Sequence, residues 1–252
     1  MKRLMILVLA LAGLIALFAA CDVDIDVDID DGDGETLQGS GNVVSEQMAL
    51  ADFTTVEAQN AFELQITQSD SFAVTVRADD NIMDLADVSK VDDTLKLRLE
   101  RGVSLRNATL EAEITMPDLE GLDLSGASRA SVSGFRSSGQ LDIGLSGASS
   151  LDGDLEAGDV DINASGASRV VLDGSATGLT IEGSGASSLD LADFTVETAE
   201  VRLSGASDAT VRAQERIDPV DVSGASKLRY LGDPSLGDVT TSGASTVDKI
   251  ED

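Results

Sequence analysis

The chain has 252 residues, with 46 acidic and 17 basic side chains and a formal net charge of −29 at pH 7. Because phosphate binding needs clustered lysine and arginine, this balance argues against nucleic acid as a partner and against electrostatic attachment to anionic lipid. The absence of histidine and the single cysteine exclude a Ser-His-Asp triad, a Cys-His pair, a histidine-ligated zinc ion and an internal disulfide.

The first 21 residues have the pattern of an export signal. Lys2 and Arg3 precede an apolar run at 4–20, and two alanines stand directly before Cys21. A charged start, an apolar stretch and a small-residue cleavage site mark a secretory signal peptide. The apolar run has 17 residues, at the lower edge of what spans a bilayer, so a retained membrane helix is the alternative.

The only cysteine follows the sequence LFAA. LFAAC resembles a bacterial lipobox, with Phe18 in place of the more usual leucine. The resemblance implies that residues 1–20 are a lipoprotein signal peptide and that Cys21 carries the lipid. Two or more acyl chains give stable anchoring in a membrane.

Residues 21–41 are predicted to be the lipidated cysteine and an acidic tether. Residues 22–30 read DVDIDVDID, so aspartate alternates with valine or isoleucine. Alternation is typical of a strand, and repulsion between like charges keeps a chain extended. Two interpretations of 22–31 stay open, a tether between lipid and domain and a strand that caps the open end of the domain. The aspartate spacing does not fit an EF-hand loop.

The motif Ser-Gly-Ala-Ser dominates the second half of the chain. Seven copies, 19 to 21 residues apart, begin at Ser125, Ser146, Ser165, Ser184, Ser204, Ser223 and Ser242. The positions one and three before each copy, and five after its first serine, are mostly apolar. Each unit therefore reads as strand, small-residue corner, strand and turn.

One such unit cannot bury its apolar side, but stacked units can. The sequence predicts an all-β fold over 42–252, a parallel β-solenoid with about 20 residues per rung. Regular Ser-Gly-Ala-Ser rungs are expected at 121–252 and irregular first rungs at 42–120.

The first part of the domain follows the same plan less regularly. VEAQNAFELQI at 56–66 has the skeleton of VDVSGASKLRY at 220–230, which places residues 59–62 in a corner. Further strands are expected at 72–78, 94–100 and 109–116.

Stacking explains why the same four corner residues return. Neighbouring rungs lie about 4.8 Å apart, so a bulky corner side chain would collide with its copies. Glycine tolerates unusual backbone angles, and serine hydroxyls are expected to bond to neighbouring rungs. We therefore expect a structural role for Gly166 and Gly185, and corner packing for the serines. A functional serine-lined face is the alternative.

Several stretches resemble the putative auto-transporter adhesin head GIN domain family of bacterial envelopes. They are FTTVEAQNAFELQITQSDSFAVTVRADDNI, DDTLKLRLE, the repeated SGAS, and the closing LGDPSLGDVTTSGAS, and together they span nearly all of 42–249. The resemblance implies a single-stranded right-handed β-helix in an exported, often lipid-anchored protein. It supplies no catalytic residues.

The leading functional hypothesis is a non-catalytic cell-envelope lipoprotein that presents a rigid β-helix as an adhesion, scaffold or binding surface. No catalytic, cofactor-binding or metal-ligating residue is assigned. The expected partners are a membrane, through the lipid on Cys21, and an unknown envelope protein or glycan. The expected location is the bacterial cell envelope, at the outer membrane or the periplasmic face of the inner membrane.

Two alternatives stay open. Some right-handed β-helices cleave polysaccharides with paired aspartates, but that chemistry needs two carboxylates at a set separation in a cleft. Here the acids are scattered over turns and tryptophan is absent. The other alternative is a weak calcium-dependent binding module that uses acidic turns such as Asp152, Asp154 and Asp159, although these do not match the nonapeptide calcium repeats.

Overall fold

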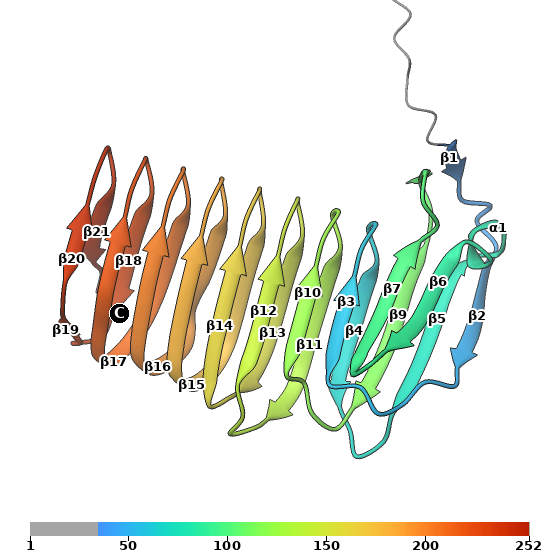
Figure 1. The fold of residues 1–252 in the computed structure, drawn as a ribbon, viewed down its shortest axis with the longest axis horizontal. Coiled ribbons are helices and arrows are strands. Elements are labelled where there is room, and N and C mark those ends of the chain that lie inside the picture. The colour runs from blue at the N-terminus through green and yellow to red at the C-terminus, as the bar shows by residue number, and fades with distance from the viewer. Residues whose placement is uncertain (1–34, 252) are drawn as a thin grey trace, which may run out of the picture. The chain divides into compact units, whose positions relative to one another are not determined.

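Twenty-one β-strands and one short helix make up residues 35–251, the part of the chain that this computed structural model describes (Figure 1). The predicted signal peptide, Cys21 and the alternating aspartates lie outside the described residues. Within 35–251 the only helix is α1 (Asp80–Met83), and no helix there is long and apolar enough to cross a membrane.

Two walls of parallel strands run through the Ser-Gly-Ala-Ser region. Strands that lead into a corner form the entry wall, which contains β10 (Gly121–Leu124), β12 (Leu141–Leu145), β14 (Asp159–Ala164), β19 (Ser235–Leu236) and β20 (Val239–Thr241). Strands that leave a corner form the exit wall, which contains β11 (Arg129–Arg136), β13 (Ser150–Glu156), β18 (Lys227–Leu231) and β21 (Thr246–Lys249).

Three long strands bend from the exit wall into the entry wall of the next rung and join the two walls into one continuous sheet. They are β15 (Arg169–Gly183), β16 (Ser188–Leu203) and β17 (Asp208–Val222).

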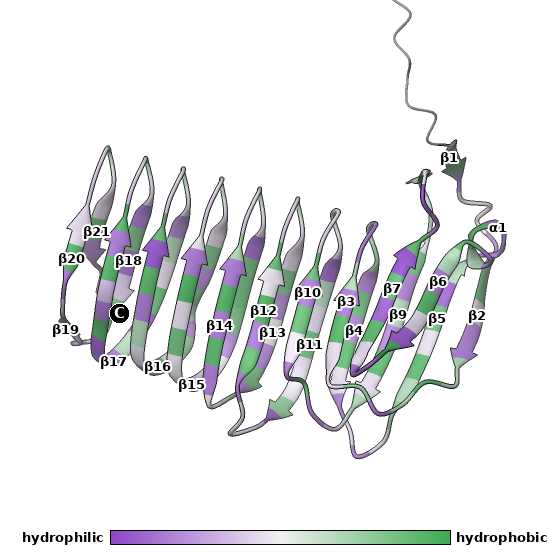
Figure 2. Cartoon of the chain, in the orientation of Figure 1, coloured by the Kyte–Doolittle hydropathy of each residue, from purple (hydrophilic) through white to green (hydrophobic). Residues whose placement is uncertain are grey.

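The same position of each repeat lies beside its copy in the next rung. Ile143 is paired with Ile162, and Ile162 with Ile181. All three are buried. Outward positions between them are polar, so hydrophobic and hydrophilic bands alternate along the strands (Figure 2). These parallel, in-register rungs confirm the predicted β-solenoid.

The rungs near the N-terminal end do not stack in chain order. Four parallel strands belong to them, β3 (Thr55–Ala58), β4 (Glu63–Gln68), β7 (Thr94–Leu99) and β9 (Leu110–Met116). The rung of β3 and β4 lies between that of β7 and β9 and that of β10 and β11. The predicted corner at 59–62 is confirmed, because the Ala61 N–H donates to the Gly126 carbonyl oxygen at 3.1 Å.

Beyond the rung of β7 and β9 the strand pairing becomes antiparallel, which was not predicted from the sequence. The strands concerned are β2 (Val43–Met48), β5 (Ala73–Asp79) and β6 (Ala86–Val91). Strand β5 pairs antiparallel with both β9 and β2, and β6 pairs antiparallel with β7. The turning strands cover the apolar interior of the last parallel rung, where Val74 and Val76 of β5 are fully buried.

A small separate sheet precedes this antiparallel cap. Residues 35–38, which the sequence analysis placed in the tether, form β1 (Glu35–Gln38) and pair in parallel with β8 (Val103–Arg106). The ladder of backbone hydrogen bonds ties the start of the described chain to the domain.

The C-terminal end has no comparable cap within residues 35–251. Val239 is paired with the buried Val220, yet it is 43% exposed. Leu236, paired with the buried Ile217, is 38% exposed. These inward-facing side chains are exposed because no described strand follows the last rung.

Candidate functional site

All seven Ser-Gly-Ala-Ser corners place glycine in the left-handed region of backbone space, with φ between 61° and 77°. Only glycine adopts this region without steric cost. A Cβ atom at Gly166 would lie 2.4 Å from the carbonyl oxygen of Gly147, and one at Gly185 would lie 2.5 Å from that of Gly166. The structural role predicted for both glycines is confirmed.

The second serine of each corner packs inside the turn. In six corners its side chain is buried, at Ser128, Ser149, Ser168, Ser187, Ser207 and Ser226. Its hydroxyl generally donates to the carbonyl of the first serine in the same corner, as from Ser168 to Ser165 at 2.7 Å. The prediction of bonds to neighbouring rungs is therefore wrong for most of these second serines.

The first serine of the corner faces outward, and in three corners its hydroxyl reaches the neighbouring rung. The hydroxyl of Ser223 donates to the carbonyl of Leu203 at 3.3 Å, and that of Ser165 to the carbonyl of Leu145 at 3.3 Å. These bonds are long, so the hydroxyl oxygens keep lone pairs directed to solvent.

A shallow groove follows this column of first serines along the entry wall. It consists of two hollows of about 400 and 390 Å³ that share Asn163 and Ser165. One side is formed by the hydroxyls of Ser125, Ser146, Ser165, Ser184, Ser204 and Ser223. The other side is formed by the residues two positions earlier in each rung, Glu57, Asp123, Gly144, Asn163, Glu182, Arg202 and Asp221. We call this the corner groove.

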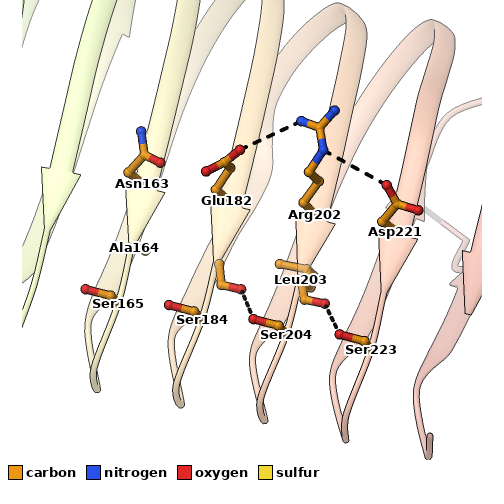
Figure 3. A pocket seen from close by; sticks show the side chains of 11 residues that line it. Asn163, Ala164, Ser165, Glu182, Ser184, Arg202, Leu203, Ser204, Asp221 and Ser223 are labelled. Atoms are coloured by element: carbon orange, nitrogen blue, oxygen red, sulfur yellow. Dashed lines mark hydrogen bonds and ion pairs between the residues drawn. The ribbon is translucent and has the colours of Figure 1, made fainter. Parts of the chain in front are cut away.

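The groove crosses seven rungs, which corresponds to a length of about 29 Å at the usual strand spacing. Figure 3 shows the part from Asn163 to Asp221, with the charged and amide side chains in one row and the hydroxyls in a second row beside it. No aromatic side chain lines either hollow.

Arg202 stands near one end of the charged row, in the sixth of its seven rungs. Carboxylate oxygens of Glu200, Glu182 and Asp221 lie 3.5, 3.9 and 4.0 Å from its guanidinium nitrogens. Arg98, by contrast, reaches Asp87 at 2.7 Å. Because hydrogen bonds of guanidinium groups are normally shorter than about 3.2 Å, these contacts are loose ion pairs rather than short hydrogen bonds.

The other end of the groove is acidic. Gly144 has no side chain and leaves a gap in the row. The Asp123 carboxylate occupies this gap, so closely that a Cβ atom at Gly144 would overlap Asp123 Oδ1. Burial raises the pKa of Asp123, and the charges of Glu57 and Asp142 raise it further. The hydrogen bond from Lys96 to Glu57, at 2.6 Å, lowers the pKa of Glu57.

The acidic turn proposed for calcium does not gather its residues. Asp152 and Asp154 lie on the exposed side of β13, where Asp154 is 3.6 Å from Arg136, whereas Asp159 begins β14 in the other wall. Nowhere in residues 35–251 do three or more His, Cys, Asp or Glu side chains come close enough to hold a metal ion. The predicted lipid site, Cys21, lies outside the described part of the chain.

The serine column was predicted from the sequence, but the row of side chains beside it was not. The signal was present, because a residue between two buried strand positions must point outward. Asn163, for example, lies between the buried Ile162 and Ala164. Reading the polar residue two positions before every copy would have located this side of the groove.

Comparison with known proteins supports the fold and the resemblance. A sequence profile described as "Putative auto-transporter adhesin, head GIN domain" matches residues 52–234. The chain belongs to this family. No curated protein sequence matches this GIN-domain protein.

Several solved structures share the fold. A putative adhesin from Bacteroides fragilis superposes with a TM-score of 0.79 at 23% identity, covering 85% of this chain and 100% of that one. A putative lipid binding protein from Parabacteroides distasonis has a TM-score of 0.69 at 17% identity, covering 86% and 100%. A putative adhesin from Parabacteroides merdae has a TM-score of 0.64 at 15% identity, covering 85% and 99%. At these identities the similarity shows the fold alone.

Proposed function

We propose that this GIN-domain protein is a non-catalytic binding protein of the bacterial cell envelope, anchored by a lipid on Cys21, and that it attaches to its partner through the corner groove. The observation that carries the proposal is the groove itself. Equivalent residues in seven successive rungs form it, and they supply hydroxyl, amide, carboxylate and guanidinium groups.

The chemistry of the groove favours binding over catalysis. Carboxylate-based catalysis needs an acid and a second carboxylate held at a set separation around the bond to be broken. In the groove Arg202 lies between Glu182 and Asp221, so these two acids face a cation rather than an open reaction site. The family description and two of the structural neighbours name adhesins, which agrees with a binding role.

The proposal is tested with two matched triple variants of the full chain. The groove variant carries Asn163→Ala, Glu182→Ala and Asp221→Ala. The control carries Asp152→Ala, Asp173→Ala and Asp190→Ala, all exposed positions of the exit wall. Binding to an immobilised envelope extract is measured for both, and circular dichroism checks folding.

We expect the groove variant to lose most of its binding and the control to keep it. Equal binding by both folded variants would refute the groove as the attachment site. A hydrolytic activity on polysaccharide that one substitution removes would refute the non-catalytic role.

A further inference from the structure

We infer that the corner groove binds a neutral, linear glycan that lies along the stacking axis, and that Arg202 is the residue that determines this specificity. The inference rests on the proposed function and names the class of ligand for the same site.

The shape of the groove fits a chain rather than a compact molecule. Small ligands are usually bound in concave pockets that bury most of their surface. Here two hollows continue into each other through Asn163 and Ser165, over a length of about 29 Å. The same two rows of polar groups return in each rung, so a polymer with a short repeat meets similar partners at every step.

The groups that line the groove match a glycan better than a peptide. Extended peptides bind along a free strand edge, with pockets for alternate side chains. Strand β14, which borders the centre of the groove, is already paired on both sides, with β12 and with β15. The groove therefore offers side-chain groups only, and its floor of Ala164, Gly183 and Leu203 forms no deep apolar pocket. Sugar hydroxyls donate and accept, so they complement serine, asparagine, carboxylate and guanidinium groups together.

The charges of the groove favour a neutral chain. Carboxylates of Glu57, Asp123, Glu182 and Asp221 line it against the single guanidinium of Arg202. An acidic polymer is repelled by Glu57 and Asp123 toward one end of the groove and by Glu182 and Asp221 toward the other. A strongly cationic polymer is repelled by Arg202, which lies between Glu182 and Asp221. Burial raises the pKa of Asp123, and the negative charges of Glu57 and Asp142 add to this effect.

Arg202 is suited to select the ligand because its nearest carboxylates are 3.5 to 4.0 Å away. Its donors can turn to a sugar oxygen without breaking a short hydrogen bond, and a hydrogen bond from a charged donor is stronger than a neutral one. With no aromatic side chain in the lining, each sugar contributes little, so affinity must grow with the number of rungs occupied.

The test uses the full chain purified in detergent and binding to immobilised polysaccharides. The neutral probes are hydroxyethyl cellulose, galactomannan and xyloglucan. The acidic probes are polygalacturonate and alginate, the cationic glycan is chitosan, and polylysine represents a basic peptide. Arg202→Met is compared with Arg169→Met, an exposed arginine on the exit wall, and thermal melts check that both variants fold.

We expect binding to at least one neutral polysaccharide, none to the acidic ones, and weaker binding to short fragments of the same glycan. Arg202→Met should weaken binding to the neutral polysaccharide by about tenfold or more, the effect of losing a charged hydrogen bond. Arg169→Met should leave this binding unchanged.

Binding confined to acidic glycans, chitosan or polylysine would overturn the inference, as would equal behaviour of the two variants or no binding to any probe. If envelope extract is still bound through the groove while every neutral glycan fails, the ligand class is wrong and the proposed function stands. If the groove variant binds envelope extract as well as the control does, the proposed function fails as well.

Discussion

At the scale of single residues, the corner glycines are alike in backbone angle but not in surroundings. Gly147 has φ 72° and Gly166 has φ 74°. The Gly147 carbonyl accepts from the Ala167 N–H at 2.7 Å, whereas the Gly126 carbonyl turns the other way and accepts from Ala61. The atom nearest to a Cβ at Gly147 would therefore be the Gly126 nitrogen at 3.3 Å, while a Cβ at Gly166 would meet a carbonyl oxygen at 2.4 Å.

This difference makes the two glycines a matched pair. Gly147→Ala should destabilise the fold by about 1–2 kcal/mol, the cost of a left-handed alanine. Gly166→Ala carries the same cost and an overpacking term of about 1–3 kcal/mol. Urea unfolding of both variants measures the difference, and equal losses would show that the rungs do not stack as closely as described.

The acidic end of the groove predicts a pH dependence with a defined sign. Because the folded-state pKa of Asp123 is raised, the folded state holds the proton more tightly than the unfolded state. Stability from this group is therefore lost as pH rises from the ordinary aspartate pKa, near 4, through the raised value. Asp123→Asn should stabilise the protein at pH 7 by less than about 1 kcal/mol, since the group is partly exposed and screened.

The gain of Asp123→Asn should vanish in acid, below the ordinary aspartate pKa. Glu57→Gln is the control of opposite sign, because the folded-state pKa of Glu57 is lowered by Lys96. Its variant should be less stable than the parent at pH 7, and the difference should disappear only below the lowered pKa of Glu57. Melting curves at both pH values decide, and a loss of stability for Asp123→Asn at pH 7 would contradict the assignment.

At the scale of elements, the antiparallel cap depends on one buried carboxylate. Asp79, at the end of β5, is 1% exposed. Its Oδ1 accepts from the Gly41 N–H and its Oδ2 from the Thr109 N–H, both at 2.7 Å. The side chain thereby joins the segment before β2 to the start of β9.

Removing this carboxylate should loosen the cap. Asp79→Ala leaves two N–H groups without their acceptor, and we expect a loss of about 2–4 kcal/mol in the free energy of unfolding. The neighbouring Asp80 is the control, because it is exposed and accepts from Ser40 and Asn42 at the surface. Asp80→Ala should cost much less than Asp79→Ala, because substitutions at exposed positions usually have small effects. Similar losses in urea unfolding for both variants would contradict this role of Asp79.

The elements also show what the sequence could predict and what it could not. The strands expected at 72–78, 94–100 and 109–116 correspond to β5, β7 and β9, because period-two alternation is a local property. The order in which these strands stack and the direction in which each runs are not determined by local sequence. Strand β5 reads like any inward-outward strand, yet it runs antiparallel to β9. Its direction follows from the turn at 69–72, which reverses the chain after β4, and from the need to cover an exposed rung.

The candidate site likewise has features that the sequence could predict and features that it could not. The corner glycines were predictable from the repeat, because steric exclusion recurs at every copy. The position of Arg202 between Glu182 and Asp221 needs the register of three rungs, which the spacing of 19 to 20 residues between their copies supplies. The gap at Gly144, occupied by Asp123, depends on side-chain packing and has no sequence signal.

At the scale of the whole molecule, the proposed anchor is at the N-terminal side of the chain and the proposed groove follows the stack of rungs. Cys21→Ser should leave a precursor that carries no lipid and keeps residues 1–20, because the thiol is the proposed acylation site. Metabolic labelling with a fatty acid and mass spectrometry of the N-terminus measure this. A variant processed and labelled like the parent would refute the anchor.

The central claim is that binding is distributed over the rungs of the corner groove. The most direct measurement is the Kd of the full chain for the immobilised envelope extract as Asn163→Ala, Glu182→Ala and Asp221→Ala are added one at a time. Each step should weaken binding by roughly two- to fivefold, the contribution of one polar contact, with the fold intact. Complete loss from one of these substitutions, or no loss from all three, would contradict the account.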